Sequence, residues 1–412
     1  MQENKLDVKK TLLLSFGFFA SSIAWSVYNS FVPQLLESYI ASTTIIGLIM
    51  TIDNVFGVIF QPLFGKMSDN TRTRFGRRMP YIFIGLPICA VAFTLIPRTN
   101  SLWSLMTVLI TFTFVMSAWR SPVVALMPDI TPGPARSQAN GIVNLMGGVG
   151  SLLAFFAGGI LFKVGGFPLP FLMSAVMMLL ALVVLALFVR EPKQAYEPEE
   201  KSKVKGEKLT PEERKSLLLI LTGVFFWFTG YNAVETFFTL YATNTLGMDA
   251  GGAAMTLSIF SLTFLTFAVP AGFIGAKKGR RKTILLGLAG LTLLFLPMIF
   301  LANAWVTRVC LFLGGFFWAM VNINSLPMVV KLSGEAKVGT FIGYYYFFSF
   351  SSQIVSPVLF GFIRDMVGHY KVLFLYACIA FALAMLSLFF VRHGEDEVEQ
   401  TSAAQVLEGL DD

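Results

Sequence analysis

Three ionisable side chains lie inside long apolar stretches of this sequence: Asp53, Arg120 and Glu235. A charge at the centre of a bilayer costs about 2.5–3.5 kcal/mol on insertion scales, so it should face a cavity and have a partner. Two carboxylates against one guanidinium leave one acid free to bind and release a proton. We therefore predict a proton-coupling site of Glu235, Asp53 and Arg120, in which Glu235 carries the proton and Asp53 is the standing partner of Arg120. Asp53 is the rival proton carrier, and a static ion pair that locks helices together is the alternative to coupling.

Neutral polar and aromatic residues accompany these charges. Amides and carboxylates can bind the hydroxyl groups of a sugar, and an aromatic ring can cover its C–H face. An unsatisfied amide in hydrocarbon is costly, so amides inside apolar runs favour a polar cavity. A single aromatic residue can instead pack in the core or lie in an interfacial belt. The predicted substrate-binding residues are Trp25, Tyr28, Asn29, Trp119, Arg120, Tyr231, Asn232, Glu235, Asn322, Asn324, Tyr345 and Gln353.

Long apolar runs must position these residues. A run of about 18 or more apolar residues is long enough to cross a bilayer as a helix. Such runs predict an all-α integral membrane protein with twelve transmembrane helices and a central cavity. They cover residues 11–36, 44–66, 80–97, 101–126, 141–162, 169–190, 216–243, 251–275, 282–302, 304–328, 339–363 and 371–392.

The composition agrees with a membrane protein. Of 412 residues, 55% are hydrophobic and 13% are charged, about half the charge content of a soluble domain, and the mean hydropathy is +0.71. These values exclude a soluble enzyme, a nucleic-acid-binding module and a disordered chain. The three cysteines lie in apolar runs without metal-type spacing. We expect no metal site and no cofactor, with the proton as coupling ion.

Lysine and arginine residues predict the orientation, because cytoplasmic loops carry an excess of them. Most follow the even-numbered runs, as in residues 72–78, 193–215 and 277–282, whereas the other loops hold few. Both termini are therefore expected in the cytoplasm, and the protein in the plasma or inner membrane. The net charge of +7 follows from this pattern and does not indicate a nucleic-acid partner. The bilayer and a small molecule are the expected partners, and the protein is expected to be a monomer.

A polar stretch at 191–215 divides the runs into six and six. Tyr28-Asn29 recurs as Tyr231-Asn232, and the Gly-Arg-Arg of 76–78 recurs at 279–281, both 203 residues later. Two matches at one offset predict two halves related by a pseudo-two-fold axis, with a substrate site between them. The predicted organisation is a half at 1–190, a cytoplasmic linker at 191–215, a half at 216–392 and an acidic disordered tail at 393–412.

Residues 65–78, GKMSDNTRTRFGRR, resemble the loop signature of the major facilitator superfamily. The long spacing between Asp69 and Arg74, and the following residues 79–82, MPYI, are similar to the sucrose-transporter-like branch and its relatives, the glycoside-pentoside-hexuronide:cation symporters. Further matches are Gln61-Pro62, Pro128-Asp129, the segment 136–140 and the segment 339–357, so that the resemblance covers nearly the whole chain.

The resemblance implies alternating access and a conformational latch. In the latch, Asp69 would pair with Arg74 and Arg77 at the cytoplasmic end, and its full set is Gly65, Asp69, Arg74, Gly76, Arg77 and Arg78. The alternative is that these bases only orient the chain. The second half has Ala276 where the first has Asp69, so the two latches are not equivalent.

The chain also departs from these relatives. It has Gly57, Gln61 and Arg120 where melibiose-permease-like members carry acids, and Thr113 where plant-type sucrose carriers carry one. A sodium site is therefore not predicted. Because the acids of these relatives are absent, Glu235 or Asp53 is the expected proton-coupling residue.

Taken together, the residues and the resemblance predict proton-coupled symport of a small sugar or glycoside, most simply a disaccharide. The alternatives are a uniporter or exporter of another polar or amphipathic solute, and more remotely a membrane sensor or enzyme. A sensor or enzyme would need a nucleophile, a metal cluster or a catalytic domain. The longest polar segment is 191–215, too short for such a domain.

Overall fold

The computed structural model describes residues 6–132, 135–191, 209–332, 338–391 and 393. Most of the predicted linker and nearly all of the predicted acidic tail lie outside these residues. Within them, twelve segments are long and apolar enough to cross a membrane, with α2 and α3 counted as one. The predicted all-α fold with twelve spans is thereby confirmed.

The first group of helices precedes the linker. Its members are α1 (Val8–Glu37), α2 (Thr43–Met50), α3 (Ile52–Asn70), α4 (Met79–Leu95) with the short 3₁₀ turn η1 (Ile96–Arg98), α5 (Leu102–Ile130), α6 (Arg136–Gly165) and α7 (Pro168–Phe188). The second group follows the linker. Its members are α8 (Pro211–Leu246), α9 (Ala250–Lys278), α10 (Arg280–Phe300), α11 (Ala304–Lys331), α12 (Val338–Val367) and α13 (Val372–Phe389).

The start of α8 follows from its sequence. The Thr210 hydroxyl accepts a hydrogen bond from the backbone N–H of Glu213, and the Glu213 carboxylate accepts one from the backbone N–H of Thr210. This reciprocal capping box, followed by proline at the first helical position, begins the helix at Pro211. Residues 211–215 of the predicted linker therefore belong to the start of α8.

The predicted span 44–66 is broken into α2 and α3 at Thr51. The Thr51 hydroxyl donates to the carbonyl of Leu48, and its backbone N–H is shared among preceding carbonyls. Back-bonding of a threonine hydroxyl to its own helix often accompanies a bend. The break gives α2 and α3 different directions, and α2 alone packs extensively against α12.

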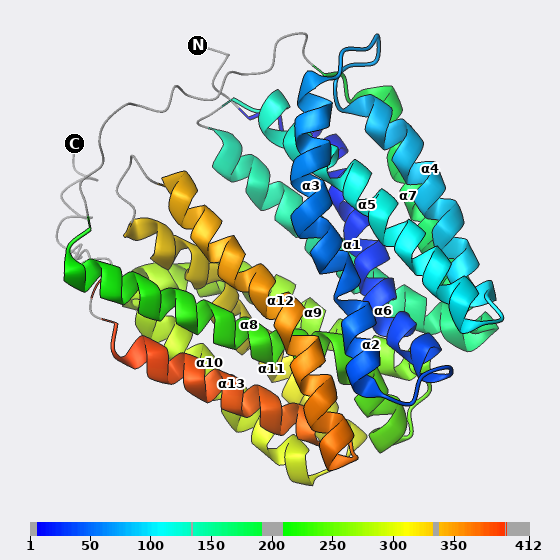
Figure 1. Ribbon diagram of the computed structural model, residues 1–412. Helices are drawn as coiled ribbons and strands as arrows, with labels where there is room; N and C mark the ends of the chain where they lie inside the picture. The colour runs from blue at the N-terminus through cyan, green and yellow to red at the C-terminus, as the bar shows by residue number, and fades with distance from the viewer. Residues whose placement is uncertain (1–5, 133–134, 192–208, 333–337, 392, 394–412) are drawn as a thin grey trace, which may run out of the picture.

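The two groups of helices lie next to each other and are separately packed (Figure 1). Contacts between them run mainly along two pairs, α6 with α9 and α2 with α12, with α1 against α8 at the centre. We call the end that holds residues 71–78 the α3–α4 end, and the opposite end, which holds residues 38–42, the α1–α2 end.

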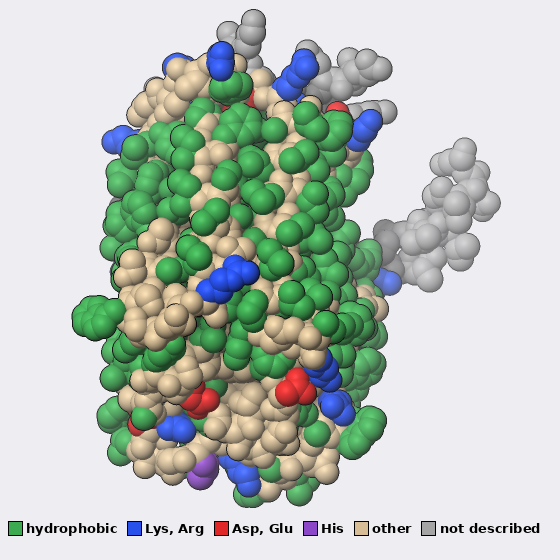
Figure 2. Space-filling view, turned by 90° about the vertical axis from the view of Figure 1, so that its right-hand side faces the viewer, with side chains coloured by type: hydrophobic (Ala, Val, Ile, Leu, Met, Phe, Trp, Pro, Cys, Tyr) green, Lys and Arg blue, Asp and Glu red, His purple; other side chains and the backbone are tan. Residues whose placement is uncertain are grey.

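The surface matches a bilayer environment. Figure 2 shows a broad band of hydrophobic side chains between the two ends, with most lysine and arginine side chains at the ends. Large apolar residues in this chain are exposed, among them Ile84, Val91 and Leu187. Such a continuous apolar surface is expected where lipid replaces water as the solvent.

Candidate functional site

A cavity of about 1050 Å³ lies between the two groups of helices. Its walls come from α1, α3 and α5 on one side and from α8 and α12 on the other. It reaches Lys66 and Asp69 at the end of α3 and Gly343 at the start of α12. The cavity therefore extends toward the α3–α4 end, where α3 and α12 lie apart (Figure 1).

The structure brings all three predicted coupling residues into this cavity. Asp53 comes from α3, Arg120 from α5 and Glu235 from α8, and each side chain lines it. Asp53 interacts electrostatically with Arg120 and, unfavourably, with Glu235. Among the described residues, the Arg120 guanidinium forms none of the close ion pairs. Asp53 is the carboxylate that interacts with it electrostatically. The three charges thus form a loose group around open space.

Four further predicted residues also line the cavity: Trp25, Asn29, Asn232 and Gln353. Asn29 of α1 and Glu235 of α8 face each other across the boundary between the two groups of helices. The Asn232 amide donates to the Ser352 hydroxyl over 3.1 Å, which fixes its orientation on α8.

The remaining predicted substrate residues lie elsewhere. The Trp119 indole N–H donates to the Cys89 sulfur, and the Asn324 amide donates to the carbonyls of Ala271 and Met320. In each case a partner inside the helix packing satisfies the polar group, so the side chain needs no cavity. Asn322 is half-buried and is absent from the residues that line the cavity.

The three predicted tyrosines also lie outside the lining of the cavity: Tyr28 and Tyr345 are buried, and Tyr231 is half-buried. Tyr28 packs on Trp25 and Phe112, and the Tyr345 hydroxyl lies 2.8 Å from that of Ser325. Tyr231 stacks on Trp318 with ring centroids 4.2 Å apart, beside a small apolar pocket that Glu235 also lines. Tyr28 and Tyr345 are therefore buried in the helix packing and do not line the cavity in this conformation.

Sequence reasoning missed several residues that line the cavity. They are Asn54, Gln61, Tyr346, Phe347 and Phe350. Gln61 lies about two turns after Asp53 on α3, and Tyr346 and Phe350 lie two turns and one turn before Gln353 on α12. This helical spacing from a predicted residue is the sequence signal that points to these three.

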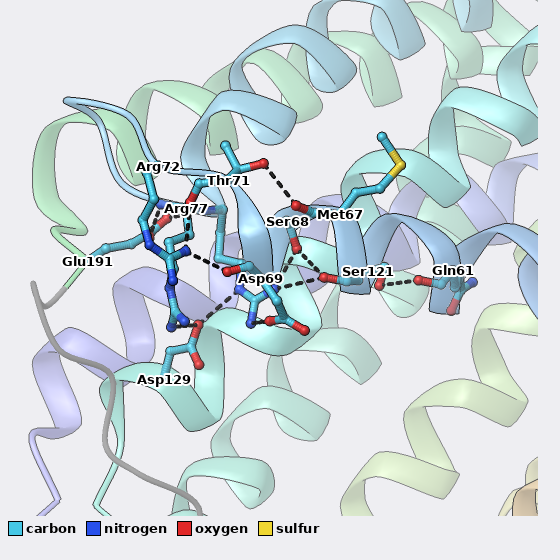
Figure 3. Close-up of polar contacts among 12 residues, drawn as sticks. Gln61, Met67, Ser68, Asp69, Thr71, Arg72, Arg77, Ser121, Asp129 and Glu191 are labelled. Carbon is cyan, nitrogen blue, oxygen red and sulfur yellow. Dashed lines mark hydrogen bonds and ion pairs between the residues drawn. The ribbon is translucent and has the colours of Figure 1, made fainter.

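The predicted latch forms a charged cluster at the α3–α4 end (Figure 3). Arg78 pairs with Asp69 and, over 3.0 Å, with Asp129, which also pairs with Arg77 over 3.0 Å. Burial lowers the pKa of Arg78, but the hydrogen bond and charge of Asp129, together with Asp69, raise it overall. The cluster therefore keeps its cation at any accessible pH.

Arg74 does not belong to this cluster. Its side chain is exposed and lies over the Phe75 ring, 4.6 Å from the centroid. The chain turns at residues 71–78, so Arg78 rather than Arg74 points back toward Asp69. The expected pairing of Asp69 with Arg74 and Arg77 is replaced by Asp69 with Arg78.

Glu191, which follows α7 in the chain, is also part of the cluster. Its carboxylate accepts hydrogen bonds from the backbone N–H groups of Arg77, Arg78 and Met79 over 2.6, 2.6 and 2.8 Å. These are the free donors at the start of α4. Gly76, with a φ of 111°, brings the turn close enough that a Cβ there would lie 2.5 Å from the Glu191 carboxyl carbon.

Known proteins resemble this chain along most of its length. The tetracycline resistance protein, class E, of Escherichia coli is 22% identical over 84% of this chain and 85% of its own length. The multidrug resistance protein MdtG of Enterobacter lignolyticus (strain SCF1) is 24% identical over 75% of each chain.

Solved structures share the fold. A bacterial homologue of the human lysosomal transporter Spinster, in an inward-facing and occupied conformation, has a TM-score of 0.70 at 13% identity and covers 92% of this chain and 93% of its own. The nucleoside transporter NupG has a TM-score of 0.68 at 12% identity, covering 92% and 98%.

The sequence profile of the Major Facilitator Superfamily matches residues 14–257 and 241–410, nearly the whole chain. The twelve spans, the cavity between two helix groups and the cluster at the end of α3 agree with that match. The chain therefore belongs to the Major Facilitator Superfamily, and it is a multi-pass membrane transporter of small molecules and not an enzyme.

Proposed function

We propose that this transporter couples protons to the uptake of a small polyhydroxylated solute, a sugar or glycoside, by alternating access. The observation that carries the proposal is that Asp53, Glu235 and Arg120 face one cavity. With two acids and one base, one carboxylate can be neutral in part of the cycle without leaving the guanidinium uncompensated.

Glu235 is the better placed proton carrier. It lies on α8, whereas Arg120 and Asp53 lie on α5 and α3, so its distance to them changes when the two helix groups move. Asn29 faces Glu235 across the same boundary. Protonation of Glu235 would remove its repulsion with Asp53 and allow the groups to approach around a bound solute.

The lining supports a sugar-like solute. Amides of Asn29, Asn54, Asn232 and Gln353 can both donate to and accept from hydroxyl groups. Trp25 offers a ring for a C–H face. A pocket for a sugar needs such amides, which both donate and accept hydrogen bonds, together with an aromatic side chain.

Proton-coupled export of an amphipathic solute is the second candidate. Tyr346, Phe347 and Phe350 form an aromatic stripe on the α12 side of the cavity. The similar proteins named above are a tetracycline resistance protein and a multidrug resistance protein. In that case the solute would leave as protons enter, through the same carboxylates.

Transport in proteoliposomes tests the proposal. A panel of mono- and disaccharides is added outside vesicles with an imposed inward proton gradient, and solute accumulation and internal pH are followed. Symport predicts accumulation and faster acidification inside with the right sugar. Glu235→Gln should abolish accumulation but retain exchange of labelled for unlabelled solute, whereas Glu212→Gln, on the exposed first turn of the same helix, should behave as wild type.

Three results would contradict parts of the proposal. Accumulation by Glu235→Gln equal to that of wild type would remove Glu235 from coupling. Collapse of a proton gradient by amphipathic compounds, with no response to any sugar, would establish export instead. Exchange that does not depend on pH at all would identify a uniporter.

A further inference from the structure

At the α1–α2 end, hydrogen bonds of one carboxylate connect the two helix groups. Asp365, near the end of α12, accepts hydrogen bonds from the backbone N–H groups of Thr43 and Thr44 over 2.9 and 3.0 Å. It also accepts from the hydroxyls of Ser42 and Thr44, each over 2.7 Å. All four donors belong to the start of α2, so one side chain of the second group caps a helix of the first.

A second carboxylate joins the groups beside it. Glu37, at the end of α1, accepts from the Tyr370 hydroxyl over 2.9 Å and from the Asn244 amide over 3.1 Å. The Arg364 guanidinium lies 3.3 Å from Asp365 and over the Tyr370 ring. Both contacts with Glu37 come from the second group, so this end is joined by polar contacts between groups.

Between these carboxylates and the cavity, α2 and α12 touch through their backbones. A Cβ on Gly47 would lie 2.4 Å from the Pro357 carbonyl oxygen, and a Cβ on Gly361 would lie 2.5 Å from that of Thr43. No side chain fits between the helices at these positions. The seal is therefore a direct contact of two helices, held by hydrogen bonds at its outer edge.

The helices that close this end are continuous with those that line the cavity. The first part of α12, at Gly343 and Gln353, lines it, whereas the last turns carry Asp365. Likewise α2 forms the seal, and α3, just after Thr51, carries Asp53 into the cavity. Opening the α1–α2 end must break the Asp365 contacts, because their donors and acceptor lie in different groups.

We propose that Asp365 is a positioning residue for alternating access: it holds α2 against α12, so that the cavity stays open only toward the α3–α4 end until these hydrogen bonds break. A carboxylate suits this role because the start of a helix carries partial positive charge and free N–H donors. The inference rests on transport by this fold and is independent of which solute or ion the cavity takes.

Distance measurements across the α1–α2 end test the proposal. Spin labels on Asn100→Cys and Ala302→Cys, one exposed position in each group, report the separation by double electron–electron resonance. The three native cysteines are buried, and the chain without added cysteines gives the labelling background. Wild type should show a dominant short distance, and Asp365→Asn should raise the ratio of long to short distances about tenfold or more, since hydrogen bonds to a charged group are lost.

Asp249→Asn is the matched control. Asp249 lies at the same end and caps α9 through the backbone N–H of Gly252, but it does so within its own helix group. It should leave the distance distribution unchanged. An equal shift in both variants would show general loosening of this end, and no shift in a folded Asp365→Asn would overturn the proposal.

A second pair of variants keeps the test decisive if Asp365→Asn folds poorly. Gly361→Ala places a methyl group against the Thr43 carbonyl and should favour the long distance without touching a charge. Gly339→Ala, on the same helix with nothing within 4 Å of its Cβ, is its control. Identical distance distributions for Gly361→Ala, Gly339→Ala and wild type would contradict the role of the α2–α12 contact.

Discussion

At the scale of single residues, Arg78 contacts more partners than Arg77, the other cation of the charged cluster. Besides its two carboxylate partners, it donates to the Ser68 hydroxyl and to the Gly65 carbonyl. These contacts join the end of α3, the start of α4 and the end of α5. Arg74, only four residues away, makes a single ring contact at the surface.

We predict that Arg78→Gln lowers the free energy of unfolding by about 3 kcal/mol, the lower end of the range for removing one partner of a buried pair. The lower end applies because the side chain of Asp69 is 55% exposed, although those of Asp129 and Arg78 are 14% and 6% exposed. Arg74→Gln should cost less than about 1 kcal/mol. Chemical unfolding in mixed micelles, followed by tryptophan fluorescence, measures both. Equal losses would mean that Arg78 acts only as a surface charge.

Glu191 gives a second prediction at this scale. Glu191→Ala leaves three donors at the start of α4 without their acceptor, and we expect it to destabilise the protein by about 1–2 kcal/mol, as for loss of a helix cap. Glu212→Ala, exposed on the first turn of α8, is the control and should have a smaller effect. Thermal unfolding in detergent is the measurement, and unchanged stability of Glu191→Ala would contradict the capping role.

The sequence was enough to predict that Asp53, Arg120 and Glu235 face a cavity, because a charge within a membrane span is costly unless it lies beside one. It was not enough to separate Trp25, which lines the cavity, from Tyr28, which is 1% exposed in the core. Both fall in one apolar helix, and α1 has no polar face from which to read its orientation. Nor does the sequence reveal that a cysteine satisfies the Trp119 indole.

At the scale of elements, helix contacts in this protein depend on small residues. A Cβ on Gly159 of α6 would lie 2.5 Å from the Gly251 carbonyl of α9, and one on Gly251 would lie 2.4 Å from that of Gly159. This contact is part of the boundary between the helix groups. Close backbone approach through glycine is a common basis of helix packing in membranes.

We predict that Gly159→Ala destabilises the protein by about 1–3 kcal/mol, since the added methyl group overpacks the α6–α9 contact. Gly141→Ala, on the same helix with open space around its Cβ, should be neutral or stabilising by up to about 1 kcal/mol because alanine favours the helix. Thermal unfolding of the two variants in parallel measures the difference. Equal destabilisation of Gly159→Ala and Gly141→Ala would contradict the prediction, because Gly141 has open space around its Cβ and makes no such contact.

Most elements were predictable from apolar run length and from caps such as Thr210. The division of the second span was not, because the run 44–66 is continuous in hydropathy and neither proline nor glycine stands at the break. The pairing of α2 with α12 was equally hidden. It depends on Gly47 and Gly361, which are far apart in the chain and belong to no shared sequence pattern.

At the scale of the whole molecule, the distribution of basic residues predicts that the α3–α4 end faces the cytoplasm. Single cysteines labelled with a membrane-impermeant maleimide test this. Asn100→Cys should react in intact cells, and Lys278→Cys, exposed at the other end, should react only after the membrane is permeabilised. The reverse pattern would invert the orientation and make the described cavity outward-facing.

The glycine contacts between α2 and α12 have a consequence for energy conservation. A carrier that works against a proton gradient must not let water form a continuous file across the bilayer, since protons would pass along it and short-circuit the membrane potential. Two helices in backbone contact leave no such passage where they meet. If the carrier is coupled to protons as proposed, the close contact at Gly47 and Gly361 would block a proton leak where α2 and α12 meet.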